Sequence, residues 1–565
     1  MQTFADYTYE RPDIPKVKEN FYQKLERFQH AASIEQAIAA MEDINKIRNH
    51  LSTMENLVFI RASIDTRDTF YQNERDFFDE HSPEIQELTT DFYQELLTSP
   101  FEAQLREKYG SQLFDLAACE IKAFSKEIIP LLQKENKLTS AYSKLIASAD
   151  IAFRGETYTL AQLEPFAEDP ERQTRKEALE ARQCFFADNK ETLDTIYEDL
   201  VKTRQQIAEK LGFENFVEVG YLRMQRVDYN AEMVQRFRKQ VEEVIVPIAT
   251  KLYEKQAKRI GVNTLKFYDE AFVFASGNAT PKGTPDWIIE NGKKMYNELS
   301  AETSEFFQFM LDHELLDLEA KKGKESGGYC TYIEDYQSPF IFSNFNGTSG
   351  DIDVLTHEAG HAFQTYSSRH FSVPEYYFPT SESAEIHSMS MEFFTYPWME
   401  NFFKEDVEKY TYAHLSDAIQ FLPYGVAVDE FQHLVYENPD WTPEERNQAW
   451  RRLEKKYLPH RDYDGIENLE SGAFWQKQGH IYEDPFYYID YTLAQMCAFQ
   501  FLKKSQENRE QAWQDYMDLC QLGGSKPFLE LVQSAGLASP FEEGTVEAAV
   551  SFIEDWLHKV DDQAL

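Results

Sequence analysis

Apolar residues recur at helical spacing along most of this 565-residue chain, and this pattern limits the possible folds more than any other feature. Proline and glycine interrupt the pattern only sparsely, and no repeat period or low-complexity linker separates independent parts. We therefore predict a large, mainly α protein that buries one core or two to three closely packed units. Clear examples of the spacing are Ile121, Phe124, Ile128 and Leu131, and later Val426, Phe431 and Val435.

One segment departs from this pattern. Residues 323–350 are rich in aromatic and β-branched residues and are bounded by glycine and proline, which is typical of strands. Tyr329 to Ile333 and Phe340 to Phe345 predict a short hairpin that leads directly into the next helix. We expect this small sheet to brace that helix, or to offer an edge to which a peptide adds by main-chain hydrogen bonds. In the second case Gly328 and Tyr329 would contact the peptide, and Gly327 and Gly328 would allow close backbone approach.

Charge and cysteine content exclude several classes of protein. With 98 acidic and 57 basic side chains the formal net charge is -41, which disfavours nucleic acid and anionic membranes as partners. The five cysteines are widely spaced and form no C-x-x-C pair, as expected in a reducing compartment. The first residues lack a basic and an apolar signal region, and no run of 18 apolar residues occurs. We predict a cytoplasmic protein; nothing in the sequence defines its oligomeric state.

The helix after the predicted hairpin carries H-E-A-G-H, from His357 to His361. Residues four apart lie on one helix face, so both imidazoles can bind a single metal ion. Glu358 lies about 100° round the helix, where it reaches a water bound to the metal instead of the metal itself. A similar stretch, H-E-L-L-D from His313 to Asp317, lacks the second histidine, and we interpret it as a surface helix.

A catalytic zinc requires a third protein ligand and an open position. Residues 380–394 predict a second helix, on which Glu385 follows His361 by 24 positions, a gap that lets the chain turn and return. Glu385 is therefore the preferred third ligand. Glu382, His387 and His370 are the alternatives. Glu392 is either a solvated side chain or an acceptor that orients a ligand histidine, and Asp353, one turn before His357, has a similar claim.

These motifs resemble one known family. H-E-A-G-H, the later A-E-I-H-S-M-S-M-E from Ala384 to Glu392, and the preceding G-G-Y-C and S-P-F-I-F-S-N-F-N-G-T segments resemble the thimet oligopeptidase and oligoendopeptidase F family of zinc peptidases. The bacterial oligoendopeptidase F and Pz-peptidase branch is most similar. The resemblance implies that His357, His361 and Glu385 bind one Zn²⁺ per chain and that Glu358 is the general base.

The resemblance also implies an architecture. The fold would be a helical zincin-type peptidase with a small sheet beside the active site and a deep substrate channel. Residues 1–190 would form an N-terminal helical region that covers the channel, and residues 191–565 would form the catalytic region. Such a channel would admit short unfolded peptides and exclude folded proteins.

A second segment, residues 479–495, is suited to stabilising a transition state. The oxyanion that develops at a scissile carbonyl needs hydrogen-bond donors, which histidine and tyrosine supply. We predict His480 and Tyr491 as the catalytic pair, with Tyr488 and Tyr482 as substrate contacts. Tyr487 is a further candidate, because this tyrosine-rich stretch can be aligned with the family pattern in more than one register.

The sequence therefore predicts a zinc-dependent endopeptidase that cleaves internal bonds of short unfolded peptides. Two alternatives remain. A zinc carboxypeptidase or dipeptidyl carboxypeptidase of related helical fold can use the same ligand spacing. A non-catalytic, acidic peptide-binding protein would carry the H-E-x-x-H by chance.

Overall fold

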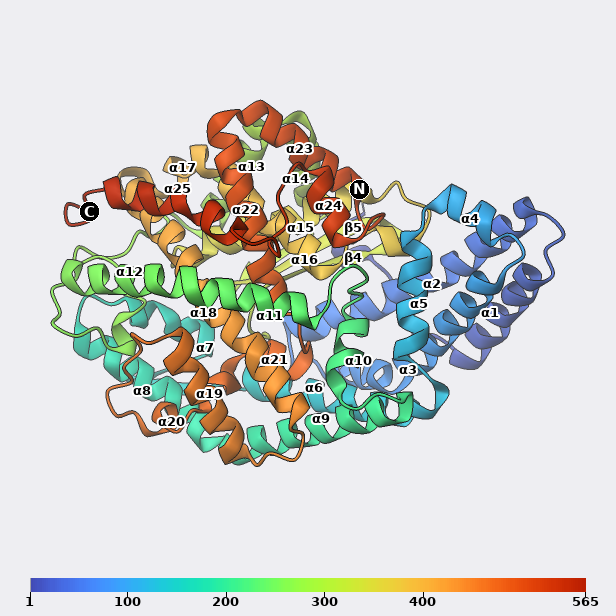
Figure 1. Cartoon of the computed structure of the whole chain (residues 1–565), viewed down its shortest axis with the longest axis horizontal. Helices are drawn as coiled ribbons and strands as arrows, with labels where there is room; N and C mark the ends of the chain where they lie inside the picture. Colours follow the sequence, from blue (N-terminus) through green and yellow to red (C-terminus); the bar gives the residue numbers. More distant parts are fainter. Residues whose placement is uncertain (1) are drawn as a thin grey trace.

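The computed structural model describes residues 2–565, and helices dominate it, which confirms the mainly α prediction. The first five helices lie together at one end of an elongated molecule and are blue in Figure 1. Asp13 and Ser33 begin the first two by accepting hydrogen bonds from Lys16 N and Gln36 N, as N-cap residues do. These helices are α1 (Ile14–Gln29), α2 (Ile34–Ile64), α3 (Thr69–Thr98), α4 (Glu102–Tyr109) and α5 (Gln112–Ala123).

Many of their buried side chains, including Phe21, Phe92 and Phe114, form a small core together with Val373 and Tyr376. A much larger core runs through the rest of the molecule and extends into the first helices through Met54 and Leu57. The predicted division at residue 190 coincides with a helix junction, since α8 ends at Asp188 and α9 begins at Lys190. The division into a covering region and a catalytic region remains a prediction.

The middle of the chain adds helices and one small hairpin that the sequence analysis did not predict, β1 (Ile151–Phe153) with β2 (Glu156–Tyr158). A π-helical segment, Val241–Ile245, joins α11 to α12. The helices are α6 (Ile129–Ala147), α7 (Leu160–Leu163), α8 (Arg172–Asp188), α9 (Lys190–Leu211), α10 (Phe216–Arg223), α11 (Ala231–Gln240), α12 (Val246–Arg259), α13 (Pro285–Leu299) and α14 (Ala301–Asp312).

A second sheet has three strands in the order β3-β5-β4, so β4 lies at an edge. The strands are β3 (Leu316–Glu319), β4 (Tyr329–Ile333) and β5 (Ser338–Phe345). The β4–β5 hairpin was predicted, and its register runs from Tyr329 opposite Phe342 to Ile333 opposite Ser338. β3 pairs in parallel with β5.

The prediction of a surface helix at His313 to Asp317 was wrong. α14 ends at Asp312, and Glu314 has a φ of 54°, a left-handed conformation that stops a helix. Leu315 and Leu318 are then buried in the core, which favours a strand at this position over an exposed helix turn.

The remaining helices of the chain follow, some of them at the centre of the molecule and others at its edges (Figure 1). They are α15 (Gly350–Ser368), α16 (Ser381–Phe394), α17 (Glu400–Phe403), α18 (Val407–Glu437), α19 (Pro443–Tyr457), α20 (Glu467–Glu470), α21 (Gly479–Glu483), α22 (Ile489–Glu507), α23 (Arg509–Leu522), α24 (Phe528–Ser534) and α25 (Thr545–Lys559). None of the helices between residues 2 and 565 combines the length and apolar character needed to cross a bilayer.

The two helices predicted to carry the metal ligands, α15 and α16, pack unusually closely. A Cβ placed on Gly360 would lie 2.6 Å from both His387 O and Ser388 Cα of α16. Only glycine permits this approach, because any side chain would collide with the backbone of the second helix. The glycine inside H-E-A-G-H therefore sets the distance between the two helices.

Candidate metal centre

Three side chains that are predicted metal ligands converge where α15 faces α16. His357 and His361 lie one turn apart on α15, and Glu385 comes from α16. Glu385 Oε2 lies 3.1 Å from His357 Nε2 and 3.3 Å from His361 Nε2. One potential ligand atom from each of these three side chains lies within 4.8 Å of the other two, a spacing at which all three can bind a single metal ion.

The spacing suits a tetrahedral ion. Bond lengths of about 2.0–2.1 Å from zinc to nitrogen or oxygen place tetrahedral ligands about 3.3 Å apart, close to the two distances above. Burial opposes ionisation of Glu385, yet His361 and His357 outweigh it and hold the pKa of this carboxyl well below its usual range. Glu385 is thus held as a carboxylate, the form that binds a metal ion.

The same carboxylate is fixed by two hydroxyl groups. Ser388 Oγ, one turn further along α16, donates to Oε2 at 2.8 Å. The Tyr487 hydroxyl donates to Oε1 at 2.6 Å from the segment that precedes α22. Tyr487 was one of several candidate tyrosines but was not preferred, because the register of the tyrosine-rich stretch was ambiguous. The Tyr487 hydroxyl thus donates its hydrogen to the predicted metal ligand Glu385 and not to a substrate.

Glu392, two turns after Glu385 on α16, connects the site to α18. Its Oε1 lies 2.7 Å from His357 Nδ1, and its Oε2 lies 2.7 Å from His414 Nε2. The first contact fixes which nitrogen of His357 faces the other two ligand groups, since Nδ1 is used by Glu392. Of the two roles considered for Glu392, the structure favours the orienting one.

Asp353 reaches this network only indirectly. It accepts a hydrogen bond from the Tyr410 hydroxyl at 2.7 Å and lies 3.9 Å from His414 Nε2. Burial raises the pKa of Asp353 to about 6 and lowers that of His414, but Glu392 and Asp353 outweigh burial and raise the His414 pKa to about 9. His414 was not found from the sequence, because it belongs to no motif and lies on a helix 22 positions after Glu392.

Glu358 is buried beside the ligands but does not join them. Its Oε2 finds no hydrogen-bond partner within residues 2–565, and burial raises the pKa of the carboxyl. A Cβ on Gly328, just before β4, would lie 3.3 Å from Glu358 Oε1. The carboxylate therefore places Oε1 beside the glycine that precedes the edge strand, while Oε2 keeps unused hydrogen-bonding capacity.

His480 and Tyr491, the two residues predicted as catalytic donors, lie within hydrogen-bonding distance of each other. Gln478 Nε2 donates to His480 Nδ1 at 2.9 Å, which leaves the proton on Nε2, 3.1 Å from the Tyr491 hydroxyl. Both residues line the same cavity as the three ligand groups. In this arrangement His480 Nε2–H is donated to the Tyr491 oxygen, and the hydrogen of the Tyr491 hydroxyl is free to be donated within that cavity.

The other tyrosines predicted to contact substrate differ from each other. Tyr329 lines the cavity, stacks on Phe342 with ring centroids 4.7 Å apart, and bonds Ser63 through its hydroxyl. Tyr488 lines a neighbouring cavity that also contains Glu392 and His414. Tyr482 is 0% exposed and stacks on Tyr142, so it has no surface to offer a substrate.

The alternative third ligands lie away from the cluster. Glu382 bonds Thr380 at the start of α16, and the pKa of its buried carboxyl is raised well above the usual range. His387 is fully buried and its Nδ1 contacts Ser383 O at 2.8 Å. His370 is exposed near Ser367 O, beyond the end of α15. Glu385 is the candidate that the fold brings to the two histidines.

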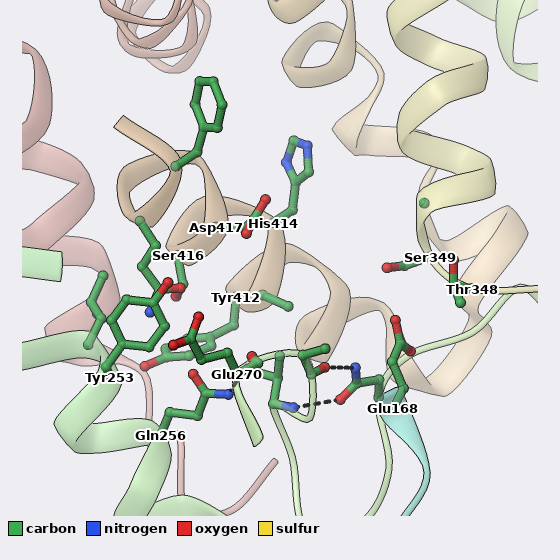
Figure 2. Close-up of a pocket in the computed structure, with 18 of the residues that line it drawn as sticks. Glu168, Tyr253, Gln256, Glu270, Thr348, Ser349, Tyr412, His414, Ser416 and Asp417 are labelled. Atoms are coloured by element: carbon green, nitrogen blue, oxygen red, sulfur yellow. Dashed lines mark hydrogen bonds between the residues drawn. The ribbon is translucent and has the colours of Figure 1, made fainter. Parts of the chain in front are cut away.

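The ligand groups open into a cavity of about 750 Å³. β4 and the two glycines before it form part of its wall, together with Glu358, His480 and Tyr491. A second cavity of about 480 Å³ lies between α12 and α18 and is shown in Figure 2. In that view His414 and Asp417 extend from one helix, and Glu168 and Glu270 come from separate segments of the chain.

An H-E-x-x-H helix, a glutamate from the following helix and an unused carboxylate beside them are the parts of a metallopeptidase site. The profile described as Peptidase family M3 matches residues 166–283 and 292–551, and the Peptidase M3 N-terminal domain profile matches residues 4–124. The chain belongs to peptidase family M3 and is a metallopeptidase.

Individual relatives agree with this family. A solved structure described as Pz peptidase A with inhibitor 2 is 63% identical, with a TM-score of 0.99 over 99% of this chain and 100% of that one. The oligopeptidase PepF of Bacillus subtilis is 22% identical over 94% of this chain and 82% of its own length. The oligoendopeptidase F of Enterococcus faecium, at 15% identity and a TM-score of 0.63, covers 98% of both chains and shares the fold.

Proposed function

We propose that this protein is a zinc-dependent endopeptidase that cleaves internal bonds of short, unfolded peptides. One observation carries the proposal. Three potential metal ligands at tetrahedral spacing lie beside the unpartnered Glu358, and all four side chains line a cavity bordered by an edge strand. The names of two relatives, oligopeptidase PepF and oligoendopeptidase F, support oligopeptides as substrates. A cytoplasmic location fits five cysteines that are all free in the described chain.

His357, His361 and Glu385 would hold the metal. Two imidazole nitrogens and one carboxylate oxygen form a borderline donor set that suits zinc and matches its catalytic sites with two histidines and one glutamate. When bound, zinc would polarise the scissile carbonyl and make water more acidic. Glu392 keeps Nδ1 of His357 occupied, and Tyr487 and Ser388 keep the Glu385 carboxylate oriented.

The remaining side chains would handle protons and charge. Glu358 has a free carboxylate oxygen and serves as the general base, which takes a proton from the attacking water and returns it to the leaving amine. We assign the Tyr491 hydroxyl as a donor to the carbonyl oxygen as charge develops on it, and His480 Nε2, now bonded to Tyr491 in the same cavity, as a second donor when substrate replaces that bond.

Main-chain contacts would hold the peptide. Within the described sheet the outer edge of β4 has no partner strand, and Gly328 and Tyr329 border the cavity. An extended peptide that adds to this edge gains affinity from its backbone and leaves its side chains largely unread. This mode of binding suits an enzyme that accepts varied sequences, and an interior cavity would exclude folded proteins.

Digestion of a graded series of peptides tests the proposal. Purified protein is incubated with peptides of increasing length, with and without a chelator, and the products are weighed by mass spectrometry. We expect internal cleavage that the chelator abolishes and added zinc restores, with an upper limit on length. Release of single residues or dipeptides from the C-terminus alone, with failure on C-terminal amides, would identify the exopeptidase alternative instead.

A further inference from the structure

Lys477 stands where three cavities meet. It ends the short helix Ala473–Lys477, three positions before His480, and its side chain is half-buried. It lines the cavity that contains the ligand groups, the second cavity of Figure 2, and a smaller one beside α8. No other charged side chain of residues 2–565 borders all three of these cavities. A group bound at Lys477 would therefore lie on the path that extends from the catalytic cavity.

The ammonium group of Lys477 lacks a carboxylate partner. Within residues 2–565 no carboxylate oxygen lies within 4.0 Å of its Nζ. Nζ instead lies 4.5 Å from the centroid of the Phe474 ring, a cation–π contact. Two arginines are its neighbours, of which Arg461 is already paired with Glu270 at 2.9 Å. Burial, followed by Arg182 and Arg461, lowers the pKa of Lys477 to about 7. No carboxylate of the described residues therefore forms an ion pair with Lys477, and burial and the two arginines favour its neutral form.

Lys324, a buried lysine, has a different environment from that of Lys477. Lys324 is 3% exposed, and its Nζ bonds the Asp317 carboxylate as well as three main-chain carbonyls. The chain carries 98 acidic and 57 basic side chains, so carboxylate partners are abundant. Lys477 has no such partner, so a negative group bound beside it would favour its protonated, charged form.

The surroundings limit where a negative group can bind. Beyond Lys477, the second cavity is lined by Asp353 and by Glu168 and Asp417, the latter two labelled in Figure 2. Burial, and to a lesser extent the carboxylates of Glu164, Asp353 and Asp351, raise the pKa of Glu168 to about 7. A carboxylate would be repelled from that wall and attracted to Lys477, next to the catalytic cavity.

We propose that Lys477 binds a carboxylate of the peptide substrate and so helps to decide which peptides are cleaved and where. This inference rests on the proposed peptidase function and deepens it. Every free peptide carries a C-terminal carboxylate, and some carry acidic side chains as well. An anchor for the C-terminal group would fix the number of residues between the scissile bond and the end of the substrate.

Matched peptides separate the two sources of the carboxylate. One neutral peptide is made as the C-terminal acid and as the amide, and a third version is the amide with a single glutamate on the C-terminal side of the scissile bond. kcat/KM is measured for the wild type, Lys477→Gln and Lys477→Arg. Lys503→Gln removes an equal charge at an exposed position and is the control.

For the wild type we expect the acid to exceed the amide in kcat/KM by about 10- to 100-fold, as a charge-assisted hydrogen bond would give. Lys477→Gln should bring this ratio close to one, Lys477→Arg should largely restore it, and Lys503→Gln should keep it. A Lys477-dependent preference confined to the glutamate peptide would assign the site to acidic side chains. Equal losses on all three peptides in Lys477→Gln would overturn the proposal, whereas no cleavage of any peptide by the wild type would overturn the peptidase function itself.

Discussion

Replacement of Glu392 tests whether a contact outside the ligand set tunes the metal centre. Glu392 Oε1 accepts from His357 Nδ1 at 2.7 Å, a charge-assisted hydrogen bond. Such bonds contribute about 1.5–3 kcal/mol, and neutral ones roughly half as much. Glu392→Gln keeps the shape but loses the charge, so zinc affinity should fall by about 3- to 13-fold. Glu392→Ala loses the whole bond and should lower the affinity by about 10- to 150-fold.

The assay is a competition between the protein and a chelator of known zinc affinity, followed at equilibrium for the wild type and both variants. Glu400→Gln, which changes an exposed acidic residue in α17, is the matched control and should behave as the wild type. His414 Nε2 lies 2.7 Å from Oε2, the other carboxylate oxygen of Glu392. Because His414 acts on His357 only through Glu392, His414→Ala should also weaken zinc binding, though less than Glu392→Ala. Zinc affinities of both Glu392 variants within threefold of the wild type would refute this reasoning.

Two further predictions concern Tyr487, which contacts a predicted metal ligand, and Glu135, which forms buried ion pairs with two arginines. Tyr487→Phe removes the hydroxyl that donates to Glu385 Oε1 at 2.6 Å, and we expect the zinc affinity to fall by about 10-fold. The control, Tyr488→Phe, should leave the zinc affinity unchanged. Equal zinc affinities of the two variants would contradict this prediction. Glu135 is buried between Arg204 and Arg223. The two arginines outweigh burial and lower the pKa of Glu135 below the usual 4.5. Its ionised form therefore stabilises the fold above pH 4.5, and this contribution is lost as the pH falls through the folded-state pKa. Glu135→Gln should therefore destabilise the protein at pH 7 by about 3 kcal/mol, and the difference in thermal midpoint should shrink below about pH 4; a difference that stays constant with pH would contradict it.

Local patterns in the sequence predicted the parts of the site that lie on one element. His357, Glu358 and His361 share one helix turn, and the helical period alone places the imidazoles together. The hairpin was found because strand residues between glycine and proline contrast with the surrounding helices. Glu385 was preferred for its spacing, and its approach to the histidines depends on Gly360, whose role in helix packing becomes visible only in three dimensions.

Contacts between distant elements could not be predicted in this way. His414 of α18 contacts Glu392 of α16, and nothing near His414 in the sequence marks that contact. Tyr487 and Tyr482 lie in one tyrosine-rich stretch, yet the first contacts Glu385 and the second is buried in the core. Periodicity cannot separate them, since the turn between α21 and α22 breaks the helical register.

The central claim is that His357, His361 and Glu385 hold the metal while Glu358 is reserved for the proton. Glu358→Gln tests it most directly, through the zinc content per chain and the rate of peptide cleavage measured on the same sample. We predict close to one zinc per chain, as in the wild type, with cleavage reduced by at least about 1,000-fold. Substantial cleavage with zinc bound would show that another group is the base, and loss of zinc would show that Glu358 belongs to the metal site.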